Sequence, residues 1–178
     1  MTTTEIPSLE ELNYIPFLDE SGQITTQLQG KIGVYAIFNR DQIMQLVGYS
    51  RDIYLSLKQH LVCQPQECYW LKVETINRPN RTMLEKIKEA WIAQNGVTPP
   101  GNSTQEEQWH QPINVKPAMT AAEIATYEAG GELEQAKLLK QVARRIEAEI
   151  KDDLAQRGVQ MEMRFNPKLK EQGLLTLK

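Results

Sequence analysis

The sequence predicts an α+β protein in which a small three-stranded antiparallel sheet is flanked by helices and followed by a C-terminal helical extension. Two short runs rich in β-forming residues, 33–38 and 43–47, surround the turn-forming stretch 39–42 and predict a hairpin. A third run of this kind, 69–76, follows a helical stretch and predicts the third strand. Apolar residues at helical spacing over 132–157 predict the extension.

Two helices are predicted to flank the sheet. Ser50 or Asp52 can cap the first helix, and Pro79 and Asn80 open the second, which Gly96 ends. Each helix carries apolar residues at the spacing that gives one buried face. These residues are Ile53, Leu57 and Leu61 in the first helix, and Met83, Leu84, Ile87, Trp91 and Ile92 in the second.

Composition divides the chain into four parts. Residues 1–29 form an acidic arm with five acids and no Lys or Arg, and its scattered apolar residues are expected to dock on the domain. Residues 30–101 form the α+β domain, and the proline-containing stretch 102–119 is predicted to be a linker. The helical C-terminal extension covers 120–178.

The extension holds the strongest helical pattern in the chain. Thr120 and Glu123 have the spacing of a capping box, and Gly130-Gly131 should interrupt the first helix. The long helix carries an apolar residue at every fourth position: Leu138, Val142, Ile146, Ile150 and Leu154. Such a stripe packs on its own domain or against another helix, and we expect the 120–157 helices to bind a protein partner. Alternation of apolar and polar residues over 159–165 predicts one more strand.

Charge and composition narrow the class of protein. The formal net charge is −3, while residues 30–101 carry nine Lys or Arg against six Asp or Glu, which leaves nucleic-acid binding open without arguing for it. Because the sequence shows neither a signal-peptide pattern nor an apolar stretch of membrane-spanning length, we expect a cytoplasmic protein with no membrane span. Cys63, Cys68 and His60 are one ligand short of a four-ligand zinc site, so no metal site is predicted.

Gly33-Val34-Tyr35 and Leu46-Val47-Gly48, on the two strands of the hairpin, resemble the name-giving motifs of the GIY-YIG nuclease superfamily. Ser50, Asp52 and Ile53 at the start of the following helix and His60 near its end extend the resemblance. It covers residues 30–101 and implies a GIY-YIG-like fold. It also implies metal-assisted phosphodiester hydrolysis, in which two tyrosines orient water, a helix arginine meets the phosphate and a glutamate holds the metal.

Only part of that site is present in this sequence. Tyr35 and His60 match the first tyrosine and the helix histidine of the family. Leu46 stands at the position of the second tyrosine, Ser56 at that of the arginine, and Lys88 at that of the glutamate. The hydroxyl, the cation and the carboxylate that the resemblance implies are therefore missing, which predicts impaired catalysis.

Nearby charged residues could take over some of these roles. Glu85 and Glu89 lie beside the glutamate position, and Arg51 and Lys58 lie within about one turn of the missing cation, although such residues on helix faces usually contact only water. The candidates for vestigial or weak catalysis are Tyr35, His60 and Glu89, and those for nucleic-acid binding are Arg51 and Lys58. No cofactor is predicted, and Mg or Mn is expected only if nuclease activity is retained.

A closer resemblance is to the N-terminal domain of the chloroplast CGFS-type monothiol glutaredoxins. The matching residues are Gly33-Val34-Tyr35-Ala36, Leu46-Val47-Gly48, Gln59-His60-Leu61, Cys68 and Pro99-Pro100-Gly101-Asn102. This resemblance implies a photosynthetic, cyanobacterial source and a redox role for Cys68, through a disulfide with a glutaredoxin cysteine. Because this chain contains no CGFS sequence, the glutaredoxin would be a partner. An inert Cys68 is the alternative.

Three functions remain open at this point. The leading one is a catalytically impaired GIY-YIG-like domain that serves as a protein-binding or regulatory module, redox-linked to a glutaredoxin or a photosynthetic partner. The second is a weak divalent-metal-dependent DNA endonuclease. The third is a non-cleaving nucleic-acid-binding protein that uses exposed cations, namely Arg40, Arg51, Lys58, Arg78 and Arg81.

Overall fold

The computed structural model, which describes residues 6–178, contains a four-stranded antiparallel sheet in the order β1-β4-β2-β3. The three long strands are β2 (Ile32–Phe38), β3 (Met44–Ser50) and β4 (Trp70–Ile76), and β1 (Ile15–Pro16) pairs with one end of β4. The predicted α+β fold is confirmed, with β2, β3 and β4 as the predicted strands. β1 carries no sequence signal, since two residues ending in proline show no alternation.

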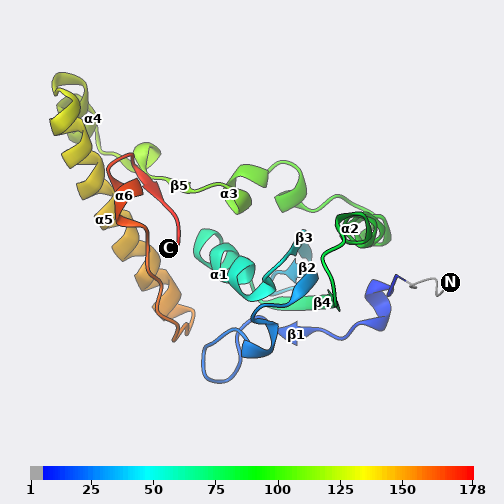
Figure 1. Cartoon of the computed structure of the whole chain (residues 1–178). Helices are drawn as coiled ribbons and strands as arrows, with labels where there is room; N and C mark the ends of the chain where they lie inside the picture. The colour runs from blue at the N-terminus through cyan, green and yellow to red at the C-terminus, as the bar shows by residue number, and fades with distance from the viewer. Residues whose placement is uncertain (1–5) are drawn as a thin grey trace. The chain divides into compact units, whose positions relative to one another are not determined.

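Two helices cover opposite faces of this sheet (Figure 1). Helix α1 (Ile53–Cys63) begins at Asp52, whose carboxylate accepts the N–H of Leu55, and α2 (Arg81–Asn95) begins at Asn80, whose side chain accepts the N–H of Met83. Both predicted caps are therefore present. Gly96 ends α2 with a φ of 84°, a conformation that favours glycine.

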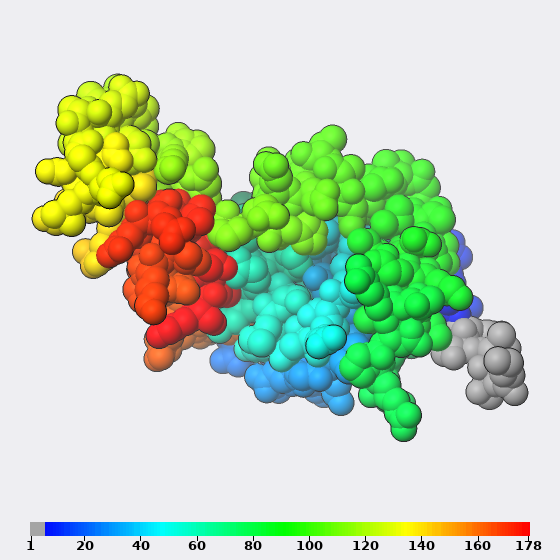
Figure 2. Space-filling model, turned by 45° about the horizontal axis from the view of Figure 1, so that its top comes forward, coloured from blue at the N-terminus to red at the C-terminus, as the bar shows by residue number. Residues whose placement is uncertain are grey.

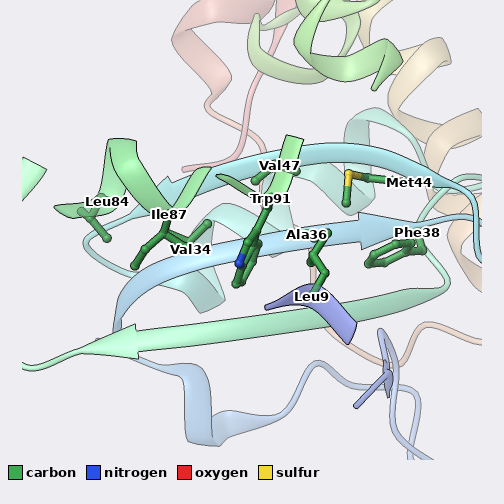
Figure 3. Packing of buried hydrophobic residues seen from close by; sticks show 9 residues of the cluster. All are labelled: Leu9, Val34, Ala36, Phe38, Met44, Val47, Leu84, Ile87 and Trp91. Carbon is green, nitrogen blue, oxygen red and sulfur yellow. The ribbon is translucent and has the colours of Figure 1, made fainter. Parts of the chain in front are cut away.

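The core on the α2 side of the sheet joins strands, helix and N-terminal arm (Figure 3). Alternate residues of β2 point to this side, because successive side chains of a strand face opposite ways. The buried members of this cluster are Leu9, Val34, Ala36, Phe38, Met44, Val47, Leu84, Ile87 and Trp91. The other face of β2, with Tyr35 and Ile37, lies on the α1 side.

Backbone-to-side-chain hydrogen bonds fasten the arm to the sheet and to α2. Trp91 Nε1 donates to the Pro7 carbonyl at 2.9 Å, and the N–H of Leu9 donates to Gln94 Oε1 at 2.8 Å. The ammonium of Lys72, a buried residue, donates to the Leu9 carbonyl at 2.7 Å and lies over the Tyr14 ring. The expectation that the arm docks is confirmed for its described residues.

The chain divides into two units, the described residues up to His110 and Gln111–Lys178. The first unit therefore includes the arm and also residues 102–110, which hold the end of the 3₁₀ helix η3 (Pro100–Asn102) and all of α3 (Glu106–His110). Two further 3₁₀ helices of this unit, η1 (Leu9–Glu11) and η2 (Thr26–Leu28), belong to the arm.

The second unit is built around one long helix. Its elements are β5 (Ile113–Asn114), η4 (Lys116–Ala118), α4 (Ala121–Ala129), α5 (Glu132–Gln156), α6 (Pro167–Lys170) and β6 (Leu174–Leu175), and β5 pairs with β6. The capping box at Thr120 and the break at Gly130-Gly131 are confirmed. None of the helices formed by residues 6–178 combines the length and the apolar character needed to cross a membrane.

One expectation for this unit is wrong, and the structure shows which of the two packings that were left open the α5 stripe adopts. The strand predicted over 159–165 is wrong: only Phe165 forms a bridge there, with Leu177, although Val159, Met163 and Phe165 are buried as the alternation indicated. The α5 stripe packs within its own unit, on α4, η4, α6 and β6. Val142 and Leu154 in this stripe are buried.

A buried tyrosine-histidine pair as the candidate functional site

Tyr35 and His60 form a hydrogen-bonded pair between the sheet and α1. The Tyr35 hydroxyl lies 2.7 Å from His60 Nε2. Tyr35 pairs with Gly48 across β2 and β3, and a Cβ at Gly48 would lie 2.7 Å from the Tyr35 hydroxyl oxygen. Glycine in the second motif thus gives the tyrosine of the first motif its space, so the two motifs meet in the structure.

Backbone and burial fix the protonation of His60. Its Nδ1 lies 3.0 Å from the Trp109 carbonyl, which can only accept, so Nδ1 carries the proton and Nε2 accepts from Tyr35. Burial, followed by the nearby His110, lowers the pKa of His60 from 6.5 to about 4. The imidazole is therefore neutral near pH 7 and the pair carries no charge.

Hydroxyl groups stand where the nuclease resemblance implies a cation. Burial raises the pKa of Tyr35, while the Ser56 side chain at its hydroxyl opposes that rise. The hydroxyl oxygens of Ser56 and Ser50 are 2.6 Å apart, and Ser50 Oγ donates to the Asp52 carbonyl. Ser56 therefore joins Tyr35 to a neutral hydroxyl chain, and this chain brings no positive charge to the site.

Residues 99–110, the covering segment, lie over the Tyr35–His60 pair and the adjacent part of β3. A Cβ at Gly101 would lie 2.7 Å from the Gln45 carbonyl oxygen and 2.9 Å from Leu46 Cδ1. The Asn102 side chain accepts the N–H of Val47 and donates to its carbonyl, both at 2.8 Å. In Figure 2 the light-green atoms of this segment lie against the teal and cyan atoms around α1.

This cover closes the site to solvent. Tyr35 is 3% exposed, His60 5% and Leu46 0%. Trp109 is also fully buried, and its ring centroid lies 5.8 Å from that of His60. A phosphodiester cannot reach the Tyr35 hydroxyl while the covering segment is in place.

The predicted carboxylate does not join the pair. Glu89 is exposed on α2, and within residues 6–178 it forms no hydrogen bond or ion pair with Tyr35 or His60. Glu85 instead accepts a 2.5 Å hydrogen bond from the Tyr49 hydroxyl. Lys88 lines a separate pocket of about 310 Å³ together with Glu106 and His110.

The predicted basic residues lie on different elements. Arg51 is exposed in the turn before α1, and Lys58 is half-buried on α1. Among the described residues, no three or more His, Cys, Asp or Glu side chains gather closely enough to hold a metal ion.

Both cysteines are thiols, in different environments. Cys68 is fully buried, and its Sγ lies 3.7 Å from the His60 carbonyl oxygen. Cys63, the last residue of α1, is half-buried, and Gln59 Nε2 lies 3.4 Å from its Sγ. Burial raises the pKa of the Cys63 thiol, which disfavours a reactive thiolate at that position.

Sequence reasoning missed the residues that cover the pair. Trp109 and His110 fall in the stretch predicted to be a linker, and nothing in their local pattern indicates that they contact α1. The available signal was Pro99-Pro100-Gly101-Asn102, which belongs to the resemblance to the glutaredoxin N-terminal domain although it lies outside the strands. The motif alone does not say what it contacts. In the structure, Gly101 and Asn102 contact β3.

Comparison with known proteins finds a partial relative. No family model matches the chain. Over 103 residues the chain is 29% identical to the bifunctional monothiol glutaredoxin-S16, chloroplastic, of Arabidopsis thaliana. The match covers 56% of this chain and 33% of that protein, in its N-terminal part, so the chain spans about a third of the relative's length. The predicted likeness to the N-terminal region of a chloroplast monothiol glutaredoxin is confirmed, whereas membership of the GIY-YIG superfamily stays a prediction.

Proposed function

We propose that this chain is a catalytically impaired GIY-YIG-like domain that serves as a protein-binding or regulatory module. The observation that carries the proposal is the closure of the Tyr35–His60 pair beneath residues 99–110. Phosphodiester hydrolysis requires the reacting phosphate within hydrogen-bonding distance of the catalytic groups. A buried, neutral pair under a segment that is hydrogen-bonded to β3 serves packing better than catalysis.

The substitutions in the motif support the same proposal. Leu46 has no polar group to offer, and Ser56 uses its hydroxyl within the fold, with Tyr35 and Ser50. Loss of one positioned charge stabiliser typically lowers a rate by about 10²–10³-fold, and here two charged groups are absent from the expected positions.

A redox link to a glutaredoxin is the finer part of the proposal. The relative is a monothiol glutaredoxin of the chloroplast, which supports a photosynthetic source and a glutaredoxin partner. Cys68 would supply the thiol on this chain. Because its Sγ is buried, a mixed disulfide requires the segment before β4 to open first.

The helices of the second unit are the proposed surface for a protein partner. Two large apolar side chains there are exposed, Ile124 on α4 at 41% and Leu133 at the start of α5 at 68%. Apolar side chains of this size at a surface favour contact with another protein when they are brought together.

A plasmid-nicking assay separates the module from a weak endonuclease. The full chain, Tyr35→Phe and Glu89→Gln are incubated with supercoiled DNA and magnesium or manganese. We expect no nicking above the level of a metal-free control for any of the three proteins. Metal-dependent nicking by the natural sequence that either substitution abolishes would show an active nuclease and overturn the proposal.

Mixed-disulfide formation tests the redox link. The chain is combined with a purified CGFS-type monothiol glutaredoxin, and hydrogen peroxide removes two electrons and two protons from the two thiols and is itself reduced to water. We expect mass spectrometry to detect the adduct with the natural sequence and with Cys63→Ser, but not with Cys68→Ser. An adduct that needs Cys63, or no adduct at all, would remove Cys68 from the proposal.

A further inference from the structure

A second pocket lies at the start of α2, on the face of the sheet away from the Tyr35–His60 pair. Its volume is about 340 Å³, at the lower end of the roughly 300–1,000 Å³ typical of small-molecule sites. Ile32, Pro79 and Leu84 give it apolar walls, while Tyr49, Arg51 and Arg81 bring polar groups. All of these residues belong to the first unit.

The described residues that line this pocket include two arginines and no acidic residue that could neutralise them. Arg51 comes from the turn after β3 and Arg81 from the first turn of α2, so two arginines line one cavity from different elements. The lining contains no carboxylate, and neither arginine forms an ion pair within residues 6–178. An anion bound beside both arginines would offset the mutual repulsion of their positive charges.

Tyr49 links one of the arginines to the nearest acid. Its hydroxyl hydrogen-bonds to Arg81 and donates to Glu85 Oε1, which lies outside the pocket lining. Glu85 is thus occupied by the phenol at 2.5 Å, and this arrangement leaves guanidinium N–H groups of both arginines available to a ligand.

We propose that this pocket binds a phosphate monoester that carries a small apolar or aromatic group. A monoester is close to doubly charged at pH 7, which matches two guanidinium groups, and guanidinium binds phosphate through paired N–H donors. The apolar walls suit the remainder of such a ligand, of which adenosine monophosphate is a simple probe. The inference stands apart from the proposed function, since its argument uses neither Tyr35 nor His60. Ser50 borders both the pocket and the hydroxyl chain of that site, but the proposal gives it no role.

Calorimetric titration of the full chain tests the pocket. We expect adenosine monophosphate to bind, inorganic phosphate to bind more weakly, and adenosine to give no heat. Arg51→Gln and Arg81→Gln should each weaken adenosine monophosphate by about tenfold, the usual effect of losing a charged hydrogen bond. Arg40→Gln, an exposed arginine in the β2–β3 turn outside the pocket, is the matched control and should leave the affinity unchanged.

Two results would overturn the proposal. One is the absence of binding for both phosphate-containing probes at millimolar concentration. The other is an equal loss of affinity in Arg40→Gln and in the two pocket variants, which would indicate general attraction to a basic surface. Thermal unfolding of each variant, expected to match the natural sequence, shows that any loss does not come from misfolding.

A matched pair of oligonucleotides distinguishes the source of the monoester. A short single strand with a 5′-phosphate and the same strand without it are titrated at two salt concentrations. Binding that needs the 5′-phosphate supports the proposal with a nucleic-acid end as ligand. If neither strand binds and adenosine monophosphate still does, the proposal is supported and the ligand is a free small molecule. The proposal is contradicted if the two strands bind with the same affinity to the natural sequence and Arg51→Gln binds both of them just as tightly.

Discussion

His60 illustrates how burial assigns a role to a titratable residue. Its two ring nitrogens are both engaged, one with the Tyr35 hydroxyl and one with the Trp109 carbonyl. A proton added to Nε2 would leave the Tyr35 hydroxyl without an acceptor and place a charge in a site closed to water. The fold is therefore tied to the neutral form of this side chain.

Stability should depend on the protonation of His60. The unfolded chain binds a proton there below about pH 6.5, whereas the folded chain does so only below about pH 4. The unfolded state holds more protons between these values, so the stabilisation is complete above pH 6.5 and is lost as the pH falls toward 4, by up to about 3 kcal/mol. Urea unfolding at pH 7, 6, 5 and 4.5 measures this slope.

His60→Gln is the control for that slope, because glutamine offers hydrogen-bonding groups but does not titrate. His110 contributes in the same direction, since burial, and then Lys88, lower its pKa while Glu106 and the Gly101 carbonyl oppose the effect. The difference in slope between the natural sequence and His60→Gln isolates His60. Identical slopes would contradict the assignment.

Tyr35→Phe should destabilise the fold rather than alter any surface. The change removes the donor to His60 Nε2 and leaves a buried acceptor without its partner, which costs about 1–3 kcal/mol. Tyr49→Phe is the matched control, since its hydrogen bond to Glu85 is only partly buried and water can replace it. If both variants lose the same free energy of unfolding, burial of the Tyr35 hydroxyl does not make its hydrogen bond more stabilising than that of Tyr49.

The two thiols should differ in their rate of alkylation. Cys63 is half-buried and Cys68 fully buried, so iodoacetamide should modify Cys63 first, and both more slowly than a small thiol in solution. Mass spectrometry of peptides after timed quenching measures the order. Faster modification of Cys68 would show that the segment before β4 opens readily even without a partner.

At the scale of elements, the covering segment is the part that converts a motif into a closed site. Asn102 uses both ends of its side-chain amide on Val47, so it substitutes for a neighbouring strand at that position. Removal of that amide leaves an N–H and a carbonyl of β3 to find water or remain unpaired.

Asn102→Ala should lower the free energy of unfolding by about 2 kcal/mol, because two hydrogen bonds are lost at a partly buried position. Asn95→Ala, at the exposed end of α2, removes a local hydrogen bond to the Val97 carbonyl. It should lower the free energy of unfolding by less than about 1 kcal/mol, because water can replace this bond. Chemical unfolding of both variants measures the two losses, and equal losses would contradict the role given to Asn102. Hydrogen exchange of the Val47 amide should also rise in Asn102→Ala alone.

Elements with strong local signals could be predicted from the sequence. The helix caps at Asp52 and Asn80, the capping box at Thr120 and the three long strands depend on residues close together in the chain. Tyr35 and His60 could be named as site residues from the sequence, because the motif places them on a strand and on the helix that follows the hairpin. The contacts of Asn102 with Val47, 55 residues apart, leave no periodicity that could predict them.

At the scale of the whole molecule, the first unit gathers its core from segments far apart in the chain. Leu9 from the arm packs with Trp91 from α2, and Trp91 in turn donates to Pro7. The boundary drawn from composition at residue 30 separates these partners. Composition reports the polarity of a segment, whereas the contacts depend on a few buried side chains within it.

Residues 1–110 produced alone should fold cooperatively, since the hydrogen bonds of the Tyr35–His60 pair, of the arm and of the covering segment join residues within this range. Circular dichroism and urea unfolding check this outcome. A chain that starts at residue 30 and ends at 110 is the comparison, and it should lose stability because Leu9 and its bonds to Gln94 and Lys72 are gone. Equal stability of the two would show that the arm contributes nothing.

The amide of Asn102 has a consequence for how other molecules can associate with this one. β3 is an edge strand, and exposed edges invite strand addition, both by peptide ligands and in aggregation. An incoming strand would have to displace Asn102 from Val47 before it could extend the sheet on that side. Asn102 therefore blocks strand addition at the middle of β3. A protein that binds this chain would contact side-chain surfaces and not the backbone of that strand.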